Sequence, residues 1–368
     1  MKIGVLGGGQ LGRMLALAGY PLGFTFRFFD PAPRPPAAPL AEHVSAQWDN
    51  RNALARFADG LDLVTYEFEN VPVEAVAFLA ERVSVLPPPG ALEVARDRLA
   101  EKEFLARLGV PTAPFAPVST ERELAEAATG IGFPAVLKTR RLGYDGKGQF
   151  VLQGAAGLAQ AWEALGGREL ILEGLVNFRR ELSLLALRGR DGCAAFYPLT
   201  ETVHQKGVLR LCRAPASGAS PALREEAKRV AGRVLEALDY AGVLALELFE
   251  TGDGVLVNEI APRVHNSGHW TIEGSLTSQF ENHLRALAGL PLGDTSARGY
   301  AATVNLLGRH PDRAAVLRIP GAHLHLYGKE PEPGRKLGHV TVTAGDLATL
   351  EARLAALAPV LQLHPPSV

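Results

Sequence analysis

The chain has few cysteines and almost no net charge. Its two cysteines, Cys193 and Cys212, can build neither a disulfide framework nor a four-cysteine zinc site, and their scarcity suits a reducing compartment. The 38 Lys and Arg residues against 39 Asp and Glu give a formal charge of -1, so no overall basic field attracts nucleic acid or an anionic membrane. No apolar run reaches the roughly 18 residues of a spanning helix. We therefore expect a cytoplasmic protein that binds neither nucleic acid nor membrane.

The composition is that of a globular protein with several domains. The 368 residues are 47% hydrophobic and 21% charged, and chains of this length form two or three domains. Pro87-Pro88-Pro89-Gly90 ends a βαβ-like region whose last strand is expected over 83–86, and a helix is expected over 92–108. A polar linker follows Pro291. We predict domains over 1–90, 91–290 and 297–368.

A glycine motif follows the first predicted strand, Lys2 to Leu6. Gly7-x-Gly9-x-x-Gly12, with Asp30 ending the second strand, matches the dinucleotide-binding fingerprint. The same glycines are needed wherever a strand turns tightly into a helix. The motif therefore indicates either NAD(P) binding or a structural turn.

A second glycine-rich loop spans residues 143–149 and lies between apolar strands at 134–137 and 150–152. Its N–H groups can fold over phosphates, while Lys147 and the strand-ending Lys138 add positive charge. A hairpin turn with solvated charges is the alternative. The chain has no G-x-x-x-x-G-K-[ST] run, which excludes a P-loop NTPase.

Two glutamates interrupt apolar strands on either side of a turn. A hairpin centred on Asp253 would place Glu247 opposite Glu259. Facing carboxylates repel and are costly to bury without a cation, and Mg²⁺ prefers such oxygens beside phosphates, with Asn258 as a further donor. The alternative is that both glutamates face solvent on an edge hairpin.

The run from Arg263 to Trp270 is too polar for a core and suits an anion or sugar site, unless it is an exposed loop. It contains neither G-x-S-x-G nor H-E-x-x-H, which disfavours a serine hydrolase and a zinc protease. Lys329, Arg335 and Lys336 bunch near a proline-rich turn and could bind a phosphate or be solvated.

Together these motifs resemble the ATP-grasp superfamily and, within it, the N5-carboxyaminoimidazole ribonucleotide synthetase family. The likeness extends over nearly the whole chain and includes GGGQLGRM, the Asp97-Arg98 pair, YPLTETVHQKG and HLHLYGKEPEPGRKLGH. It implies an α/β and α+β protein: an ATP-grasp fold with an N-terminal Rossmann-like preATP-grasp domain and a small β-rich C-terminal domain.

The resemblance also implies an activity. A carbon–nitrogen ligase of this kind uses ATP, Mg²⁺ and bicarbonate to carboxylate 5-aminoimidazole ribonucleotide through carboxyphosphate in purine biosynthesis, and a homodimer is expected. Whether carboxyphosphate or released CO₂ delivers the carboxyl group stays open. The N-terminal glycine motif would then be a structural turn near the substrate.

The resemblance assigns roles residue by residue. It implies an ATP site formed by Arg98, Lys138, Gly143, Tyr144, Asp145, Gly146, Lys147, Gly148, Gln149, Glu173, Gly174, Leu175, Val176, Glu181, His204, Asn258 and Glu259. Metal binding is implied for Glu247 and Glu259. The implied substrate-binding residues are Tyr144, Asp145, His265, Asn266, Ser267, Lys329, Arg335 and Lys336, with Lys138, Lys147, His265, Lys329 and Arg335 catalytic. Either Glu67 or Glu69 could reach the aminoimidazole, since both lie on one strand face.

Three other functions compete with this interpretation. Formate-dependent glycinamide ribonucleotide formyltransferase shares the fold, but the RVHNSGHW run and the basic C-terminal turn argue against it. An NAD(P)-dependent oxidoreductase would use the N-terminal glycine motif. A nucleotide-sensing module without catalysis would leave the opposed glutamates unexplained.

Overall fold

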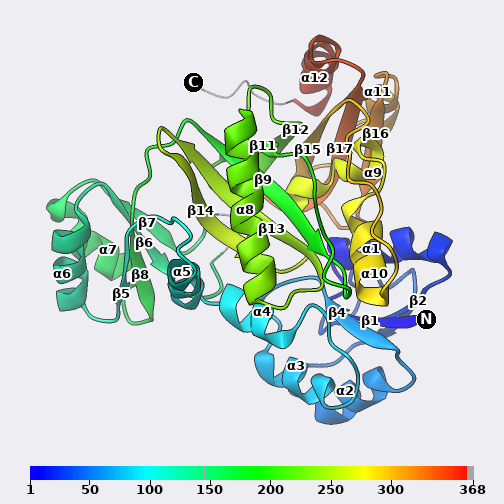
Figure 1. Cartoon of the computed structure of the whole chain (residues 1–368), viewed down its shortest axis with the longest axis horizontal. Coiled ribbons are helices and arrows are strands. Elements are labelled where there is room, and N and C mark those ends of the chain that lie inside the picture. Colours follow the sequence, from blue (N-terminus) through cyan, green and yellow to red (C-terminus); the bar gives the residue numbers. More distant parts are fainter. Residues whose placement is uncertain (144–145, 363–368) are drawn as a thin grey trace.

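The computed structural model describes residues 1–143 and 146–362, which contain three β-sheets (Figure 1). The first is a parallel sheet in the order β3-β2-β1-β4. Strands β1, β2 and β4 are mostly apolar because helices cover both faces. The expected strand over 83–86 is wrong: a single bridge joins Val85 to Val64. The elements of this sheet are β1 (Lys2–Leu6), α1 (Gln10–Gly19), β2 (Thr25–Phe29), β3 (Glu42–Val44), α2 (Arg51–Ala58), β4 (Leu63–Tyr66) and α3 (Val73–Ala80).

Two helices occupy the segment where one was expected over 92–108. They are α4 (Pro89–Ala95) and α5 (Arg98–Arg107), separated at Asp97. The Asp97 carboxylate accepts hydrogen bonds from the backbone N–H groups of Leu99 and Ala100, which is an N-cap that starts a new helix. Asp97 also pairs with Arg140 and Arg141 at 2.9 Å. The break therefore ties the start of α5 to the chain that enters the second glycine-rich loop.

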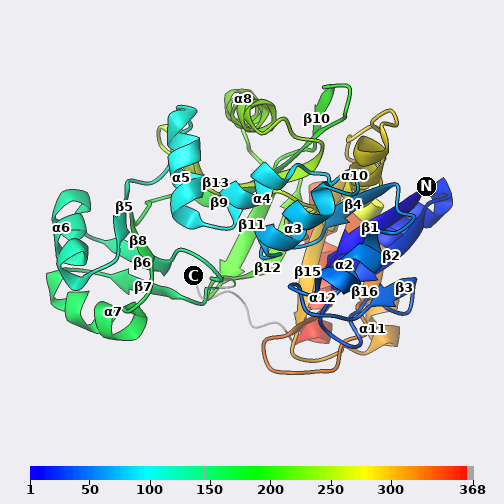
Figure 2. The same ribbon diagram turned by 90° about the horizontal axis from the view of Figure 1, so that it is seen from below.

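The second sheet is antiparallel, in the order β5-β8-β6-β7, and lies to one side of the molecule (Figure 2). Its apolar face packs on two helices, one of which begins at a capping box formed by Thr120 and Glu123. The elements are β5 (Phe115–Val118), α6 (Glu121–Ile131), β6 (Ala135–Thr139), β7 (Gln149–Leu152), α7 (Leu158–Leu165) and β8 (Leu170–Gly174).

The third sheet runs in the order β14-β13-β9-β11-β12-β15-β17-β16, with β10 beside β9. Because β12 pairs with β15, the C-terminal strands extend the same sheet. The domain limits 1–90, 91–290 and 297–368 remain a prediction. The strands are β9 (Arg180–Arg188), β10 (Ala194–Phe196), β11 (Thr200–Gln205), β12 (Val208–Ala214), β13 (Gly242–Thr251), β14 (Gly254–Ala261), β15 (Tyr300–Leu307), β16 (Ala322–Leu326) and β17 (Lys336–Ala344). The helices are α8 (Pro221–Ala237), α9 (Thr271–Gly274), α10 (Gln279–Ala288), α11 (Arg313–Leu317) and α12 (Leu347–Leu361).

Both faces of the third sheet are buried along β9 and β13. Leu184 and Leu244 pack in the cluster under α8, whereas Leu185 and Val243 pack in the cluster under α10, as the two-residue period of a strand requires. This explains why these strands read as continuous apolar runs.

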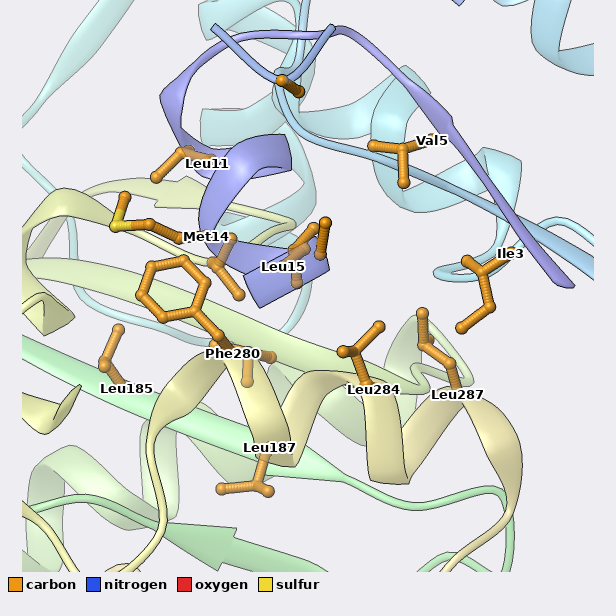
Figure 3. Close-up of a cluster of buried hydrophobic side chains, with 14 of the residues drawn as sticks. Ile3, Val5, Leu11, Met14, Leu15, Leu185, Leu187, Phe280, Leu284 and Leu287 are labelled. Atoms are coloured by element: carbon orange, nitrogen blue, oxygen red, sulfur yellow. The ribbon is translucent and has the colours of Figure 1, made fainter. Parts of the chain in front are cut away.

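Helix α10 also joins the first sheet to the third. Phe280, Leu284 and Leu287 lie between β9 and the α1 residues Leu11, Met14 and Leu15 (Figure 3). His283 accepts a hydrogen bond from the Val243 N–H at Nδ1 and donates from Nε2 to Thr65 Oγ1 at 3.1 Å. Strand β4 of the first sheet is thereby fixed relative to β13. Within the described residues, every helix is too short or too polar to cross a membrane.

Truncating this junction should destabilise the protein. We predict that Leu284→Ala, at a fully buried position, lowers the free energy of unfolding by about 2–5 kcal/mol, measured by urea denaturation. Leu17→Ala, at a side chain on α1 that is 48% exposed, is the matched control and should cost less than about 0.5 kcal/mol. Equal losses in the two variants would contradict the packing described.

Candidate active site

A cavity of about 620 Å³ lies where the three sheets meet. Its wall includes Glu67 after β4, Lys138 on β6, Glu247 on β13 and Tyr327 after β16. Of the residues expected at a site, the wall contains Arg98, Lys138, Gly143, Gly146, Gln149, Glu173, Gly174, Leu175, Val176, Glu181, His204, Glu247, Asn258, Glu259, His265, Asn266 and Lys336. Positions that are distant in the sequence thus converge on one space.

The two glutamates of the β13–β14 hairpin face each other. Glu247 pairs with Glu259, as expected, but the predicted centre of the hairpin is wrong. The turn has two residues between Thr251 and Gly254, and a β-bulge at Asn258 shifts the register by one. Both glutamates line the cavity, so the solvent-facing alternative does not apply.

The two carboxyl groups have different surroundings. Burial, and then the charge of Glu259, raise the pKa of Glu247 to about 7. Burial would also raise the pKa of Glu259, but Arg98, which donates to it at 2.8 Å, holds that pKa below its ordinary value. His265 Nε2 lies 3.5 Å from Glu247. Glu247 is thus the carboxyl group of the pair that ionises less readily.

This donor set fits a magnesium ion that is also bound by phosphates. Opposed carboxylate oxygens are hard ligands, and Mg²⁺ is usually held by one or two carboxylates together with substrate phosphates. In the part of the chain that the structure describes, no three His, Cys, Asp or Glu side chains form a complete metal site. Further ligands would have to come from a substrate or water.

Lys138 is paired within the cavity. It donates to Glu173 at 3.0 Å, and Lys102 lies 3.6 Å from the same carboxylate oxygen. Burial alone would raise the pKa of Glu173, but the two lysines lower it. Burial lowers the pKa of Lys138. Glu173 is thus shared by two ammonium groups.

The second glycine-rich loop joins β6 to β7. Gly146 and Gly148 have φ of +77° and +71°, and a Cβ on them would lie 2.7 Å from the Lys206 carbonyl and 2.6 Å from Thr139 Oγ1. Glycine is therefore required at both positions. Tyr144 and Asp145 lie outside the described residues, and Lys147 and Gly148 are not in the cavity wall.

The polar run after β14 places some of its side chains in the cavity and others behind it. His265 Nδ1 lies 2.8 Å from Ser267 Oγ, and buried Ser267 also bonds to Ser183, so Ser267 orients the imidazole from behind. Burial, then Arg263, lower the pKa of His265 to about 3. Asn266 faces the cavity, and its two buried amide atoms make no hydrogen bond with the described residues. The run is thus part of the site, not an exposed loop.

His204 and Glu181 form a second polar pair in the cavity wall. His204 Nδ1 lies 2.7 Å from the Glu181 carboxylate. Burial would lower the pKa of this histidine, but Glu181 raises it.

The N-terminal glycine motif binds the protein's own carboxylates. Glu67 accepts from the N–H groups of Gly9 and Gly12 at 2.6 and 2.8 Å, and Asp30 accepts from Gly8 at 2.7 Å. These amides would have to bind the pyrophosphate in a dinucleotide site. Since they are already paired, the motif serves as a structural turn.

The basic residues near the C-terminus are spread out. Lys336 lines the cavity, whereas Lys329 and Arg335, both within the described residues, lie outside its wall. Lys329 donates to Gln10, a wall residue, at 2.7 Å. Arg335 pairs with Glu332 at 2.5 Å.

Known proteins share both the sequence and the fold. Family models match as a ribonucleotide synthetase preATP-grasp domain over 1–96, an ATP-grasp domain over 103–280 and a phosphoribosylaminoimidazole carboxylase C-terminal domain over 301–353. The N5-carboxyaminoimidazole ribonucleotide synthase of Pseudomonas aeruginosa is 54% identical, with 96% of this chain and 98% of that one aligned. The chain belongs to the N5-carboxyaminoimidazole ribonucleotide synthase family.

Solved structures of this family superpose closely on the chain. The synthetase from Thermus thermophilus has a TM-score of 0.95 and 57% identity over 100% of both chains. The synthase from Aspergillus clavatus, in complex with ADP and 5-aminoimidazole ribonucleotide, has a TM-score of 0.92 and 34% identity over 98% of both chains. The expected ATP-grasp fold class is confirmed, and the protein is an ATP-grasp carbon–nitrogen ligase.

Three residues in or beside the cavity were given no individual role from the sequence. Glu101 lines the cavity, Lys102 reaches Glu173 from beneath it, and Arg263 pairs with Glu69 at 2.5 Å. The positions of Glu101 and Lys102, three and four residues after Arg98, put them on the same helix face as that residue. This spacing was the available signal.

The Glu69–Arg263 pair should make stability depend on pH. Burial opposes ionisation of Glu69, but Arg263 lowers its pKa to about 2. A lowered folded-state pKa stabilises the fold above the unfolded value near 4.5, and this contribution is lost as the pH falls toward 2. We predict that wild type loses up to about 3 kcal/mol more than Glu69→Gln between pH 6 and pH 2.5, by urea denaturation at each pH. Parallel pH profiles would contradict this.

Proposed function

We propose that this protein uses ATP and bicarbonate to carboxylate 5-aminoimidazole ribonucleotide at its exocyclic amine, giving N5-carboxyaminoimidazole ribonucleotide, ADP and phosphate. The observation that carries the proposal is the opposed pair Glu247 and Glu259, with Arg98 bound to Glu259, in a cavity lined by residues in or next to all three sheets. The name of the Pseudomonas aeruginosa relative and the ligands of the Aspergillus clavatus complex support this choice of substrate.

ATP would lie between the second and third sheets. The apolar side chains of Val136, Leu175 and Phe249 line this part of the cavity and suit a purine base. Glu181 and His204 would bind the ribose. Lys138 and Arg98 would neutralise the phosphates, because phosphoryl transfer depends on positioning and charge neutralisation more than on covalent chemistry.

Magnesium would be held by Glu247 and Glu259 together with the phosphate oxygens. When bound, it would supply charge neutralisation for the transferring phosphoryl group. Burial and the charge of Glu259 raise the pKa of Glu247, and this supports the assignment because a bound cation would stabilise the ionised carboxylate.

The reaction would occur in two steps. A bicarbonate oxygen attacks the γ-phosphorus and ADP leaves, which forms carboxyphosphate. The amine then attacks the carboxyl carbon, directly or after release of CO₂, and its proton leaves with the phosphate. Arg98 and Lys138 would hold the phosphoryl group during the first step, and closure of the glycine-rich segment 146–149 would exclude water from a readily hydrolysed intermediate.

The acceptor nucleotide would lie on the side of the first sheet. His265, Asn266 and Lys336 line that region, and Lys329 reaches it through Gln10. The unpartnered amide of Asn266 would then find its hydrogen-bond partners in the substrate. The Glu67 carboxylate is bound by two backbone amides and Glu69 by Arg263, so Glu67 or Glu69 could reach the base only by sharing its present partner. A cytoplasmic homodimer is the expected form.

Omitting each substrate in turn tests the proposed function. With ATP and Mg²⁺ present, ADP release should require both bicarbonate and 5-aminoimidazole ribonucleotide, measured by a coupled assay. Turnover that ignores both compounds would refute the assignment. Formate- and glycinamide ribonucleotide-dependent turnover would favour the formyltransferase instead.

Removing one charge of the glutamate pair should abolish turnover. We predict that Glu259→Gln lowers kcat by at least about 100-fold, because a metal ligand is lost and Arg98 loses its ionic partner. The unfolding transition of this variant should stay near that of wild type. Glu250→Gln, on the same strand as Glu247 but paired with Arg180, is the control and should keep most of the activity. A Glu259→Gln variant with near wild-type turnover would refute the metal assignment.

A further inference from the structure

The β-bulge at Asn258 decides which face of the sheet carries Glu259. Below the bulge, Leu248 pairs with Val257, and above it Glu247 pairs with Glu259. If the lower register continued without the extra residue, Asn258 would stand opposite Glu247. Since side chains alternate along a strand, Glu259 would then point to the other face, away from the cavity. The opposition of the two glutamates therefore depends on one inserted residue.

β14 is the outer strand of the third sheet, so its outward backbone groups and the carbonyl of the bulged residue have no partner in the ladder, and helix α5 supplies partners for some of them. Lys102 Nζ donates to the Asn258 carbonyl at 2.8 Å and to the Val257 carbonyl at 3.4 Å. The Glu101 carboxylate accepts from the Ile260 N–H. Buried backbone groups left unpaired cost about 1–3 kcal/mol each, so these two side chains favour the bulged register.

The same face of α5 also contacts Glu259, the side chain whose direction the bulge determines. Arg98, three and four residues before Glu101 and Lys102, donates to the Glu259 carboxylate. Glu101 and Lys102 are each only 2% exposed. Ionisable groups are rarely buried this deeply without a specific partner. Here the partners are backbone atoms on both sides of the bulge, together with Glu173 for the Lys102 ammonium.

We propose that Lys102 and Glu101 are positioning residues that hold the Asn258 bulge in register and so keep Glu259 opposite Glu247 on the metal-binding face. This inference rests on the proposed metal site. Neither residue needs to contact a substrate. Their effect on the reaction passes through the backbone of residues 257–260.

Metal binding to the unreacted protein tests this inference directly. Mn²⁺, which prefers the same oxygen ligands as Mg²⁺, can be titrated in the presence of ADP and followed by electron paramagnetic resonance. We expect Lys102→Met to weaken Mn²⁺ binding by about 10- to 100-fold, the usual effect of losing a residue that orients a metal ligand. Lys102→Gln, which keeps an N–H donor, should recover part of the affinity. Lys228→Met, at an exposed lysine on α8, is the matched control and should bind as wild type does.

A second readout separates positioning from general destabilisation. Amide hydrogen exchange of the segment 255–261, without metal, should be faster in Lys102→Met, and the KM for 5-aminoimidazole ribonucleotide at saturating Mg²⁺ should be unchanged. If Lys102→Met does not fold, Glu101→Met, which removes the acceptor for the Ile260 N–H, carries the test. Unchanged Mn²⁺ affinity in the folded Met variants would overturn the inference. So would an equal weakening of metal and aminoimidazole binding with faster exchange throughout the protein. Failure of the proposed function would instead be seen in wild type, as ADP release independent of the aminoimidazole nucleotide.

Discussion

The repulsion between Glu247 and Glu259 is the constraint around which the cavity is organised. Two carboxyl groups that face each other on paired strands destabilise the sheet unless positive charge lies nearby. Arg98 pairs with Glu259, whereas burial, and then the charge of Glu259, raise the pKa of Glu247. The rest of the proposed site follows from this arrangement, because a divalent ion held by the two glutamates would also bind the phosphates of ATP.

The first and third sheets meet through α1 and α10, and that packing places the N-terminal glycine motif beside the cavity. The motif has a structural role there and does not form a dinucleotide site. Glu67 and Asp30 occupy the amides that a pyrophosphate would need. A fold that resembles a nucleotide-binding domain is thus fixed to its neighbour as a wall of the substrate cavity. Motif spacing alone does not distinguish these two uses, because an anionic side chain and a phosphate satisfy the same N–H groups.

The sequence predicts most of the strands, the glycine-rich loop and the glutamate pair because each depends on local pattern. Prediction from the sequence fails where a contact with a distant helix, strand or loop determines the local structure. Asp97 breaks a predicted helix because it caps α5 and pairs with two arginines near the glycine-rich loop. The hairpin prediction reached the correct pair through an incorrect turn, since an even loop and a bulge together give the same pairing as an odd loop without one. The roles of Glu101 and Lys102 could not be predicted because their partners include backbone atoms about 155 residues away in the sequence.

A crystal structure of the protein with Mg²⁺ and a non-hydrolysable ATP analogue tests the central claim most directly. We predict one octahedral ion bound to oxygens of both Glu247 and Glu259 at about 2.1 Å and to the analogue's phosphates, with Asn258 still bulged. An ion held without either glutamate, or a straight β14 with Asn258 opposite Glu247, would contradict this claim.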